Sequence, residues 1–415
     1  MKLFKLLTIS LFTWLTLPVL AENGLNSPYT RYGFGQLAGM ETGTNKSMGG
    51  TGIGVLNSNQ INMLNPASYA AVDTLTFLLD VGMSLSNTNI AEGKTRMNSG
   101  SATFDYVAMQ FRLLPRLGMT IGLTPFSNIG YDFGGTVPVL DDGEYEITAT
   151  NRYNGVGGMR QVTAGLGYMP VKGLAIGANL SYVYGEIYHY IYNQYSETTI
   201  SSRTKQYRAD VTTYNAEFGL QYQATMGKSK FALGATYQLG HGIDDEAYII
   251  QTMEEANDTI VAHSSLNMPS AYGVGVSYSY DNRLTIAADY KLQRYGDVDF
   301  FGEKGVDSHR ASIGVEYIPE LMTRKLFRSA HYRAGLHYAT AHYTIGGKPG
   351  PTEYGATIGI GLPIMNRWNG KSIINISGQY VHVRPSESGM ITENMFRLNI
   401  GLSINETWFN KWKVQ

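Results

Sequence analysis

The stretch TEYGATIGIGLPI, residues 352–364, places apolar side chains at every second position and small or polar ones between them. Tyr354, Ile358 and Ile360 belong to the first set, and Thr357 and Gly359 belong to the second. Because successive side chains of an extended strand point to opposite faces, this alternation predicts a strand with one apolar face.

The same alternation recurs from Thr74 onward in segments of about ten residues, each followed by a turn or a loop. Segment 136–156 is ambiguous, and we treat it as a loop or a strand extension. Short links are expected on one side, and longer links near 87–100, 194–204, 242–261 and 385–393 on the other. We expect fourteen strands, near residues 75–85, 101–114, 116–133, 158–170, 172–193, 205–226, 228–241, 262–281, 283–300, 306–320, 329–345, 352–365, 371–384 and 394–405.

Alternating strands also suit a soluble β-sandwich, but two features favour a membrane barrel. Tyrosines cluster toward strand ends, as in SYVYGEIYHYIYNQY at 181–195, where interfacial aromatic girdles occur. Charge is rare on the apolar faces, whereas the opposite faces carry Asp80, Glu217, Asp289, Lys291, Glu316, Arg333 and Arg397. The predicted fold class is therefore all-β, a transmembrane antiparallel β-barrel of about 14 strands.

The first residues predict export. Residues 1–21 combine Lys2 and Lys5 with an apolar run and a small-residue cleavage site, which is the pattern of a signal peptide. The chain has no Cys, which excludes disulfides and thiolate metal sites. A net charge of −1 gives no indication of nucleic-acid binding. We expect the mature protein to lie in the outer membrane of a Gram-negative cell.

A wall of fourteen strands encloses more space than its own side chains fill. Residues 22–73 form the only sizeable stretch without strand alternation, and they precede the first strand. We therefore expect 22–73 to form an N-terminal hatch in the lumen, called the hatch segment below. The barrel itself is expected over 74–406, followed by a periplasmic aromatic and basic tail at 407–415.

The hatch segment contains the glycine-rich stretch MGGTGIGVLNSNQINMLNPASYA at 48–70. It lacks the Gly-Lys-Ser or Gly-Lys-Thr of a phosphate-binding loop, and no strand–helix context supports a dinucleotide site. Glycine allows positive φ and close approach of the backbone to the barrel wall, and Asn-Pro-Ala favours a tight turn. A direct ligand role is the alternative. The candidate hatch and ligand residues are Gly49, Gly50, Gly52, Asn65, Pro66 and Ala67.

The chain resembles the FadL/TodX family of outer-membrane transporters of hydrophobic compounds. The resemblance lies in SMGGTGIGVLNSNQINMLNPASYA at 47–70, LGMTIGLTPFSNIGYDF at 117–133 and MPSAYGVGVSYSYDNRLTIAADY at 268–290. It implies fourteen strands, an N-terminal plug, and uptake of long-chain fatty acids or other hydrophobic molecules. The ligand would be captured in the barrel and would leave through a gap in the wall into the lipids of the outer membrane.

The resemblance also implies a kink in the third strand beside this gap. Pro125 lacks an N–H for the strand ladder, and Gly130 permits a bulge. An ordinary strand end at Pro125 is the alternative interpretation.

The hatch segment has no dense cluster of Phe and Leu to line an apolar pocket, which leaves the ligand class open. An alternative function is therefore an accessory outer-membrane barrel. It would bind protein partners in a secretion complex, of the type IX kind, or in an outer-membrane assembly complex. A plain diffusion pore for polar solutes is a third possibility.

Catalytic chemistry is not predicted. The chain has no Gly-x-Ser-x-Gly motif, and its eight His are scattered. We expect no enzyme activity, cofactor or metal site. In the tail, Trp408, Phe409 and Trp412 predict an interfacial anchor, with a docking surface for a partner as the alternative.

Overall fold

The structure is a computed structural model. It describes residues 27–407 except 142–145, 198, 244–245, 254–255, 263–265, 301–302, 322, 324, 365–370 and 388. The predicted signal peptide at 1–21 and the predicted tail anchor at Trp408, Phe409 and Trp412 lie outside the described residues. Among the described residues, no helix is long and apolar enough to cross a lipid bilayer.

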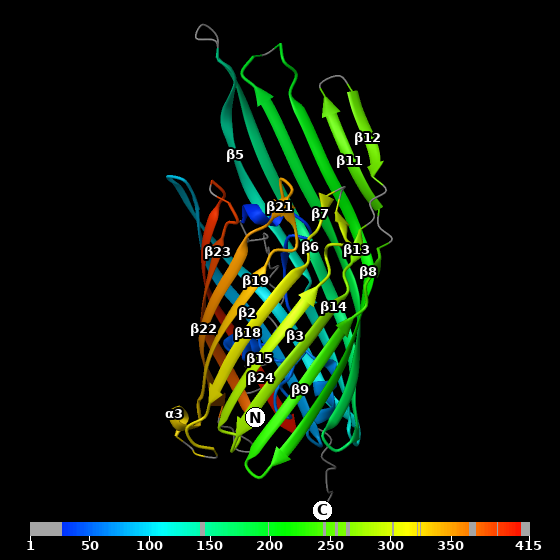
Figure 1. The fold of residues 1–415 in the computed structure, drawn as a ribbon, viewed down its shortest axis with the longest axis vertical. Coiled ribbons are helices and arrows are strands. Elements are labelled where there is room, and N and C mark those ends of the chain that lie inside the picture. Colours follow the sequence, from blue (N-terminus) through cyan, green and yellow to red (C-terminus); the bar gives the residue numbers. More distant parts are fainter. Residues whose placement is uncertain are drawn as a thin grey trace, which may run out of the picture.

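The chain folds into a closed antiparallel barrel with fourteen strand positions, which confirms the predicted fold class (Figure 1). The barrel closes where β2 pairs with β24 along residues 76–91 and 392–407. The wall consists, in chain order, of β2 Thr76–Glu92, β3 Thr95–Leu114, β4 Leu117–Pro125 continued by β5 Ser127–Asp141, β6 Glu146–Val171, β7 Leu174–Tyr195, β8 Arg203–Met226, β9 Ser229–Gln238, β14 Ala271–Tyr280, β15 Leu284–Gln293, β18 Ser308–Tyr317, β19 His331–Thr340, β22 Thr352–Ile364, β23 Ser372–Arg384 and β24 Thr392–Thr407.

Several predicted boundaries were wrong. The single strand predicted at 116–133 is two strands, β4 and β5, separated at Phe126. The loop predicted at 87–100 is mostly strand, because β2 and β3 continue to a turn at residues 93–94. The loop predicted at 242–261 contains β11 Glu246–Met253 and β12 Ala256–Ala262, and β11 pairs with the far end of β8. The ambiguous segment 136–156 extends β5 and β6 as a hairpin.

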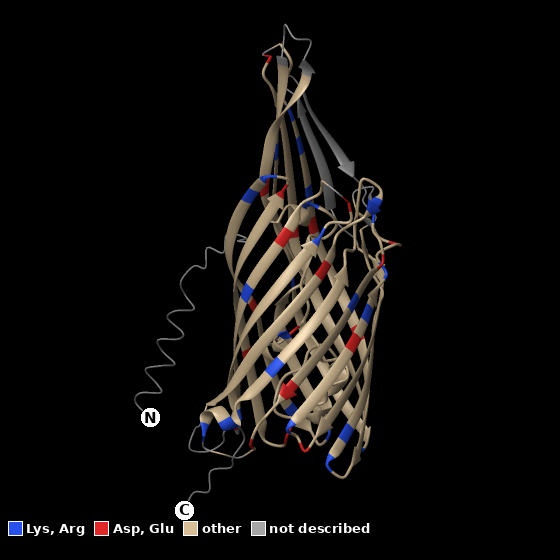
Figure 2. Ribbon diagram, turned by 60° about the vertical axis from the view of Figure 1, so that its left-hand side comes forward, with Lys and Arg blue, Asp and Glu red and all other residues tan. Residues whose placement is uncertain are grey.

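The two ends of the barrel differ. The short-turn end carries tight turns at 172–173, 227–228 and 281–283, and basic residues gather there (Figure 2). At the opposite, long-strand end, β5, β6, β7 and β8 project beyond the other wall strands (Figure 1). Several short elements lie between strands at that end: β10 His241–Gly242, β13 Asn267–Met268, β16 Asp299–Phe300, β17 Glu303–Lys304, β20 Thr344–Ile345 and β21 Lys348–Pro349.

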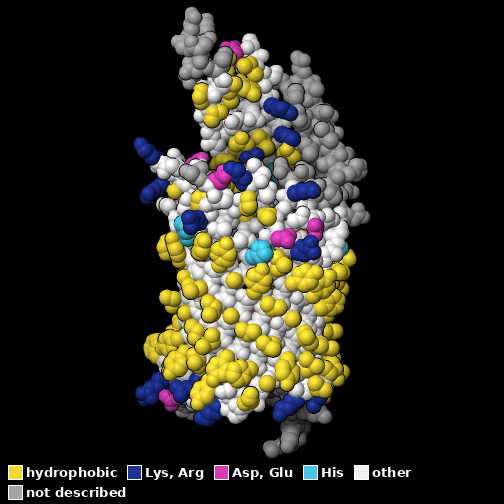
Figure 3. Space-filling view, in the orientation of Figure 1, with side chains coloured by type: hydrophobic (Ala, Val, Ile, Leu, Met, Phe, Trp, Pro, Cys, Tyr) yellow, Lys and Arg dark blue, Asp and Glu magenta, His cyan; other side chains and the backbone are white. Residues whose placement is uncertain are grey.

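The outer surface carries a broad hydrophobic band, on the face shown, between rims of charged residues (Figure 3). Ile358 is 76% exposed, whereas Thr357 beside it is 2% exposed, as the alternation in 352–364 predicts. Four charged residues of the wall strands, Asp80, Glu217, Asp289 and Arg333, are buried, so their side chains point inward. The barrel is therefore apolar outside and polar inside.

The hatch segment contributes η1 Pro28–Arg31, β1 Gln36–Leu37, α2 Gly43–Ser47 and η2 Pro66–Ala71. Its main chain presses against inward-facing glycines of seven wall strands. A Cβ added at any of these glycines would lie within 2.7 Å of a main-chain atom of the hatch segment. These socket glycines are Gly118, Gly167, Gly177, Gly234, Gly275, Gly314 and Gly335.

We expect Gly234→Val to destabilise the barrel, because its Cβ would lie 1.9 Å from the carbonyl oxygen of Ile53. The overlap forces the hatch segment away from the wall, at a cost of at least about 2 kcal/mol in the free energy of unfolding. Urea unfolding of the purified barrel in detergent micelles measures the change.

The matched control is Gly378→Val on β23, where nothing lies within 4 Å of the added Cβ. That variant should stay within about 0.5 kcal/mol of the parent chain. Equal stability of the two variants would contradict a tight fit between the hatch segment and the wall.

Candidate functional site

The glycine-rich part of the hatch segment is held by a buried carboxylate of the wall. The main-chain N–H groups of Gly52 and Ile53 both donate to Oδ2 of Asp289 on β15, at 2.6 and 2.8 Å. Gly49 and Gly50 have φ of 69° and 84°, and a Cβ on Gly49 would lie 2.9 Å from the main-chain nitrogen of Leu336. These glycines therefore serve a backbone that turns sharply against the wall.

Asn65 of the Asn-Pro-Ala triplet caps η2, which begins with Pro66 and Ala67. Oδ1 of Asn65 accepts a hydrogen bond from the main-chain nitrogen of Ala67 at 3.1 Å. Its Nδ2 donates to the carbonyl oxygens of Ile53 and, at 3.2 Å, Leu220 on β8. Pro66 lies against the wall at Gly177, and Ala67 is fully buried. Asn65 thus joins two parts of the hatch segment and ties both to the wall.

Ion pairs fix the hatch segment at other points. Nζ of Lys46 lies 2.7 Å from Oδ2 of Asp105 on β3, and Glu41 pairs with Arg310 on β18 at 3.0 Å. The hydroxyl of Tyr106 accepts a hydrogen bond from the main-chain nitrogen of Gly43 at 2.6 Å. Burial lowers the pKa of Lys46, and the neighbouring Asp105 opposes that shift. The hatch segment is bound to wall strands on several sides.

The third wall strand is interrupted at Pro125 and Phe126. β4 pairs with β3 up to Leu123, and it pairs with β6 up to Pro125. Beyond the interruption, β5 pairs with β6 on one side and with β1 of the hatch segment on the other, through Ser127 and Asn128. Among the described residues, no strand pairing joins β5 to β3.

Gly130 lies just beyond this interruption, on β5. Its carbonyl oxygen accepts a hydrogen bond from the main-chain nitrogen of Ser27 at 3.0 Å, and its N–H donates to Oγ1 of Thr30 at 3.2 Å. The hatch segment thus occupies the position beside β5 that β3 holds beside β4.

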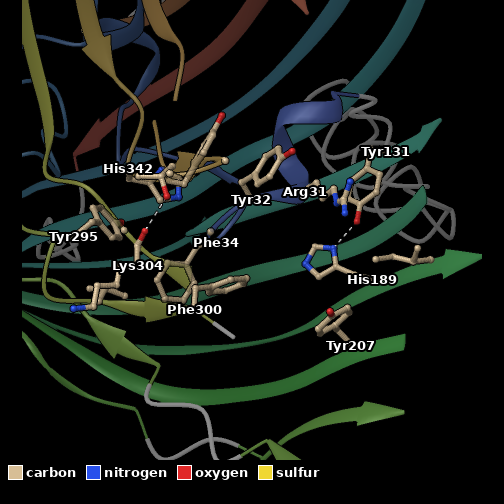
Figure 4. A pocket seen from close by; sticks show the side chains of 18 residues that line it. Arg31, Tyr32, Phe34, Tyr131, His189, Tyr207, Tyr295, Phe300, Lys304 and His342 are labelled. Carbon is tan, nitrogen blue, oxygen red and sulfur yellow. Dashed lines mark hydrogen bonds between the residues drawn. The ribbon is translucent and has the colours of Figure 1, made fainter. Parts of the chain in front are cut away.

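A cavity of about 450 Å³ lies where the start of the hatch segment meets the long-strand end (Figure 4). Aromatic rings form much of its lining. Phe34 of the hatch segment packs edge-on against Phe300, with ring centroids 5.3 Å apart, and edge-on against Phe126 at the strand interruption, at 6.4 Å. Tyr32 stacks on Tyr343 at 5.5 Å. The cavity and the strand interruption therefore share Phe34.

The cavity also has polar groups. Tyr131 on β5 is hydrogen-bonded to Nδ1 of His189 on β7 at 2.7 Å. Arg31 lies with its guanidinium over the ring of Tyr153, 4.2 Å from the centroid. His342 is buried, and burial lowers the pKa of its imidazole to about 3, so the ring is neutral at physiological pH.

None of the eight site residues named from the sequence lines this cavity. Gly49, Gly50, Gly52, Asn65, Pro66 and Ala67 lie where the hatch segment meets the wall, and Pro125 and Gly130 lie at the strand interruption. The cavity residues were not predicted from the sequence. Arg31, Tyr32, Gly33 and Phe34 are consecutive lining residues, and this short run is the part of the cavity that a local sequence pattern could have indicated. The other lining residues come from strands and loops far along the chain.

Comparisons with solved structures give the same architecture. The toluene transporter TodX of Pseudomonas putida is 14% identical, with a TM-score of 0.61, over 88% of this chain and 98% of TodX. The toluene transporter TbuX of Ralstonia pickettii is 15% identical, with a TM-score of 0.59, over 89% of this chain and 98% of TbuX. A FadL homologue of Pseudomonas aeruginosa is 11% identical, with a TM-score of 0.61, over 90% of this chain and all of the homologue.

At these identities the likeness establishes a common fold, so the predicted resemblance to FadL and TodX holds at the level of the fold. No curated protein matches the chain. A sequence model of the BamG family matches residues 3–415. Since this match covers nearly all of the sequence, the chain belongs to the BamG family.

Proposed function

We propose that this protein is an outer-membrane barrel that captures hydrophobic small molecules from outside the cell and delivers them sideways into the membrane. The long-strand end would face the exterior and the short-turn end the periplasm. The hydrophobic band on the outer surface supports a position in lipid. The aromatic cavity at the long-strand end would be the capture site, and long-chain fatty acids are one ligand class to test.

The interrupted third strand is the observation that carries this proposal. Among the described residues, β5 pairs with β1 of the hatch segment and with no part of β3. The strand ladder between β3 and the third wall strand is therefore interrupted from Pro125 toward the long-strand end. Phe34 links this position to the cavity through its contact with Phe126. A ligand held beside Phe34 has a short route to the wall there.

The fit of the hatch segment supports lateral exit over passage through the barrel. Main-chain contacts with the socket glycines and the bonds to Asp289 would have to break before a path to the short-turn end could open. An apolar molecule gains free energy by entering lipid and none by entering water. Lateral delivery therefore requires the smaller rearrangement and has the larger driving force.

We expect a disulfide between β1 and β5 to block delivery. Leu37 and Ser127 are paired residues of adjacent antiparallel strands, a spacing that suits a disulfide, and the chain has no Cys of its own. In Leu37→Cys/Ser127→Cys, oxidation would hold β1 on β5 and keep the route shut. Uptake of radiolabelled oleate would be measured in Gram-negative cells that lack their own fatty-acid transporter. It should fall to the level of cells without the barrel, and a reductant should restore it.

The matched control is Ser279→Cys/Thr285→Cys on β14 and β15, whose hydroxyls lie 3.2 Å apart in the parent chain. That disulfide lies in an unbroken part of the wall and should leave uptake unchanged. Normal uptake with the β1–β5 disulfide fully formed would overturn lateral delivery at this position. No uptake of oleate by the parent chain would overturn the transport of long-chain fatty acids.

The projecting strands favour a second candidate function, an accessory barrel that binds protein partners in an envelope complex. β5 extends to Asp141, and among the described residues no strand pairs with its outer edge beyond Asn128. Val137 and Val139 on this extension are 46% and 56% exposed. An exposed strand edge can accept an added strand from another chain.

We expect a photo-crosslinking amino acid at Val139 to capture one discrete protein in envelopes of the native host if this second function operates. The same amino acid at Leu233, 59% exposed on the membrane-facing wall, is the control and should give no such adduct. Gel mobility and peptide mass spectrometry identify the product. Equal labelling from both positions would count against a partner on the β5 extension.

A further inference from the structure

Among the described residues, the lining of the cavity at the long-strand end includes the cations Arg31 and Lys304 and no Asp or Glu. In the part of the chain that the structure describes, Arg31 has no acidic partner within ion-pair distance. A cation in a concave, partly apolar site attracts an anion more strongly than it would on an open surface.

Three buried polar atoms of the lining have no hydrogen-bond partner among the described residues. They are Nε2 of His189, Nε2 of His342 and the hydroxyl of Tyr295. The side chains of these residues are nearly inaccessible, since the residues are 6%, 6% and 1% exposed. A buried polar group without a partner costs free energy, and such groups converging on a cavity are a feature of ligand sites.

The three atoms lie on two sides of an aromatic centre. In Figure 4, His189 lies with Arg31 and Tyr131 on one side, Tyr295 and His342 lie on the other, and Phe34 and Phe300 lie between them. Phe34 also approaches Tyr295, with ring centroids 6.2 Å apart. The cavity therefore offers a polar group with a cation at one side, an aromatic centre, and polar groups again at the far side.

The aromatic residues at this centre also pack against other buried hydrophobic side chains of the protein. Phe34, Tyr295 and Phe300 belong to a buried cluster with Ile129, Met159, Val183, Ile187 and Leu266, each of which is below 1% exposed. Packed interiors of this kind leave little room for a long flexible tail. A compact, flat ligand suits the cavity better than an extended one.

We propose that this cavity binds a compact aromatic carboxylate that carries a second polar group on the opposite side of its ring, such as a hydroxylated aromatic acid. Arg31 and Nε2 of His189 bind the carboxylate, the ring lies against the contacting pair Phe34 and Phe300, and Tyr295 with His342 contacts the far polar group. The inference rests on the proposed function, because it names the ligand class of the proposed capture site.

The test uses 6-hydroxy-2-naphthoate and the full mature chain in a non-ionic detergent, with the ligand's own fluorescence as the signal. Two analogues separate the interactions: its methyl ester removes the charge, and 2-naphthoate removes the hydroxyl group. We expect the acid to bind more tightly than the ester, and added salt to weaken binding of the acid alone.

Variants assign the two sides of the cavity. Arg31→Gln should weaken binding of 6-hydroxy-2-naphthoate by at least about tenfold, the loss expected for a charged hydrogen bond, with little effect on the ester. Tyr295→Phe should weaken binding of 6-hydroxy-2-naphthoate and leave 2-naphthoate unchanged. The matched controls are Arg96→Gln on the exposed end of β3 and Tyr184→Phe on the outer wall, which should bind like the parent chain.

Equal affinity for acid and ester, or full binding by Arg31→Gln, would overturn the proposal. Unchanged urea unfolding of each variant shows that a loss of affinity does not come from misfolding. Binding at equilibrium requires no delivery into the membrane. If the acid binds as expected while oleate is not delivered, only the transport of long-chain fatty acids is overturned; delivery of oleate without binding of the acid overturns only the ligand class.

Discussion

The close approach of the hatch main chain to the inner wall is the contact on which the rest of this architecture depends. A fourteen-strand wall leaves a lumen that its own side chains do not fill, and here the hatch segment forms a second layer of polypeptide against the inner face of the wall. That layer fits only because seven wall strands present glycine where it touches them. Each glycine gives up the side-chain packing that a larger residue would supply, and the hatch segment provides the packing instead.

Buried polar groups then fix the position of this layer. Asp289 accepts two main-chain hydrogen bonds from the tightest part of the hatch segment, and Asn65 satisfies carbonyl groups of the hatch and of the wall. Such groups would be costly if the hatch segment moved away, because buried charges and carbonyls would lose their partners. The charged residues that alternation assigns to the inner face are thus part of what holds the barrel and its contents together.

The sequence predicted features that depend on local pattern. Alternation in stretches such as 352–364 arises because one face of each wall strand meets an apolar environment and the other a polar one. It therefore predicts the wall and its fourteen strand positions directly. Proline at 125 indicated a disturbed ladder, although the alternation continues through 117–133 and concealed the separation into β4 and β5. The hairpin of β11 and β12 was missed because its residues do not alternate in the same way, and it pairs with only the far end of β8.

The cavity could not be predicted from the sequence. Its lining joins Arg31 and Phe34 to His189, Tyr295 and His342, residues far apart in the chain, and no local pattern marks that meeting. The glycine-rich motif is evident in the sequence, but its glycines contact the wall and do not line the cavity. Patterns in sequence report repeated local constraints, whereas a ligand site depends on which loops converge once the barrel has closed.

The pairing of β2 with β24 has a consequence for how this molecule is made. The seam joins the first wall strand to the last, so the circle closes only after every other strand is present. The segment that precedes β2 ends up enclosed, with its main chain in contact with strands all around the circle. The contacts that hold it are therefore complete only when the seam has formed, so the enclosed segment and the closed circle of strands depend on each other.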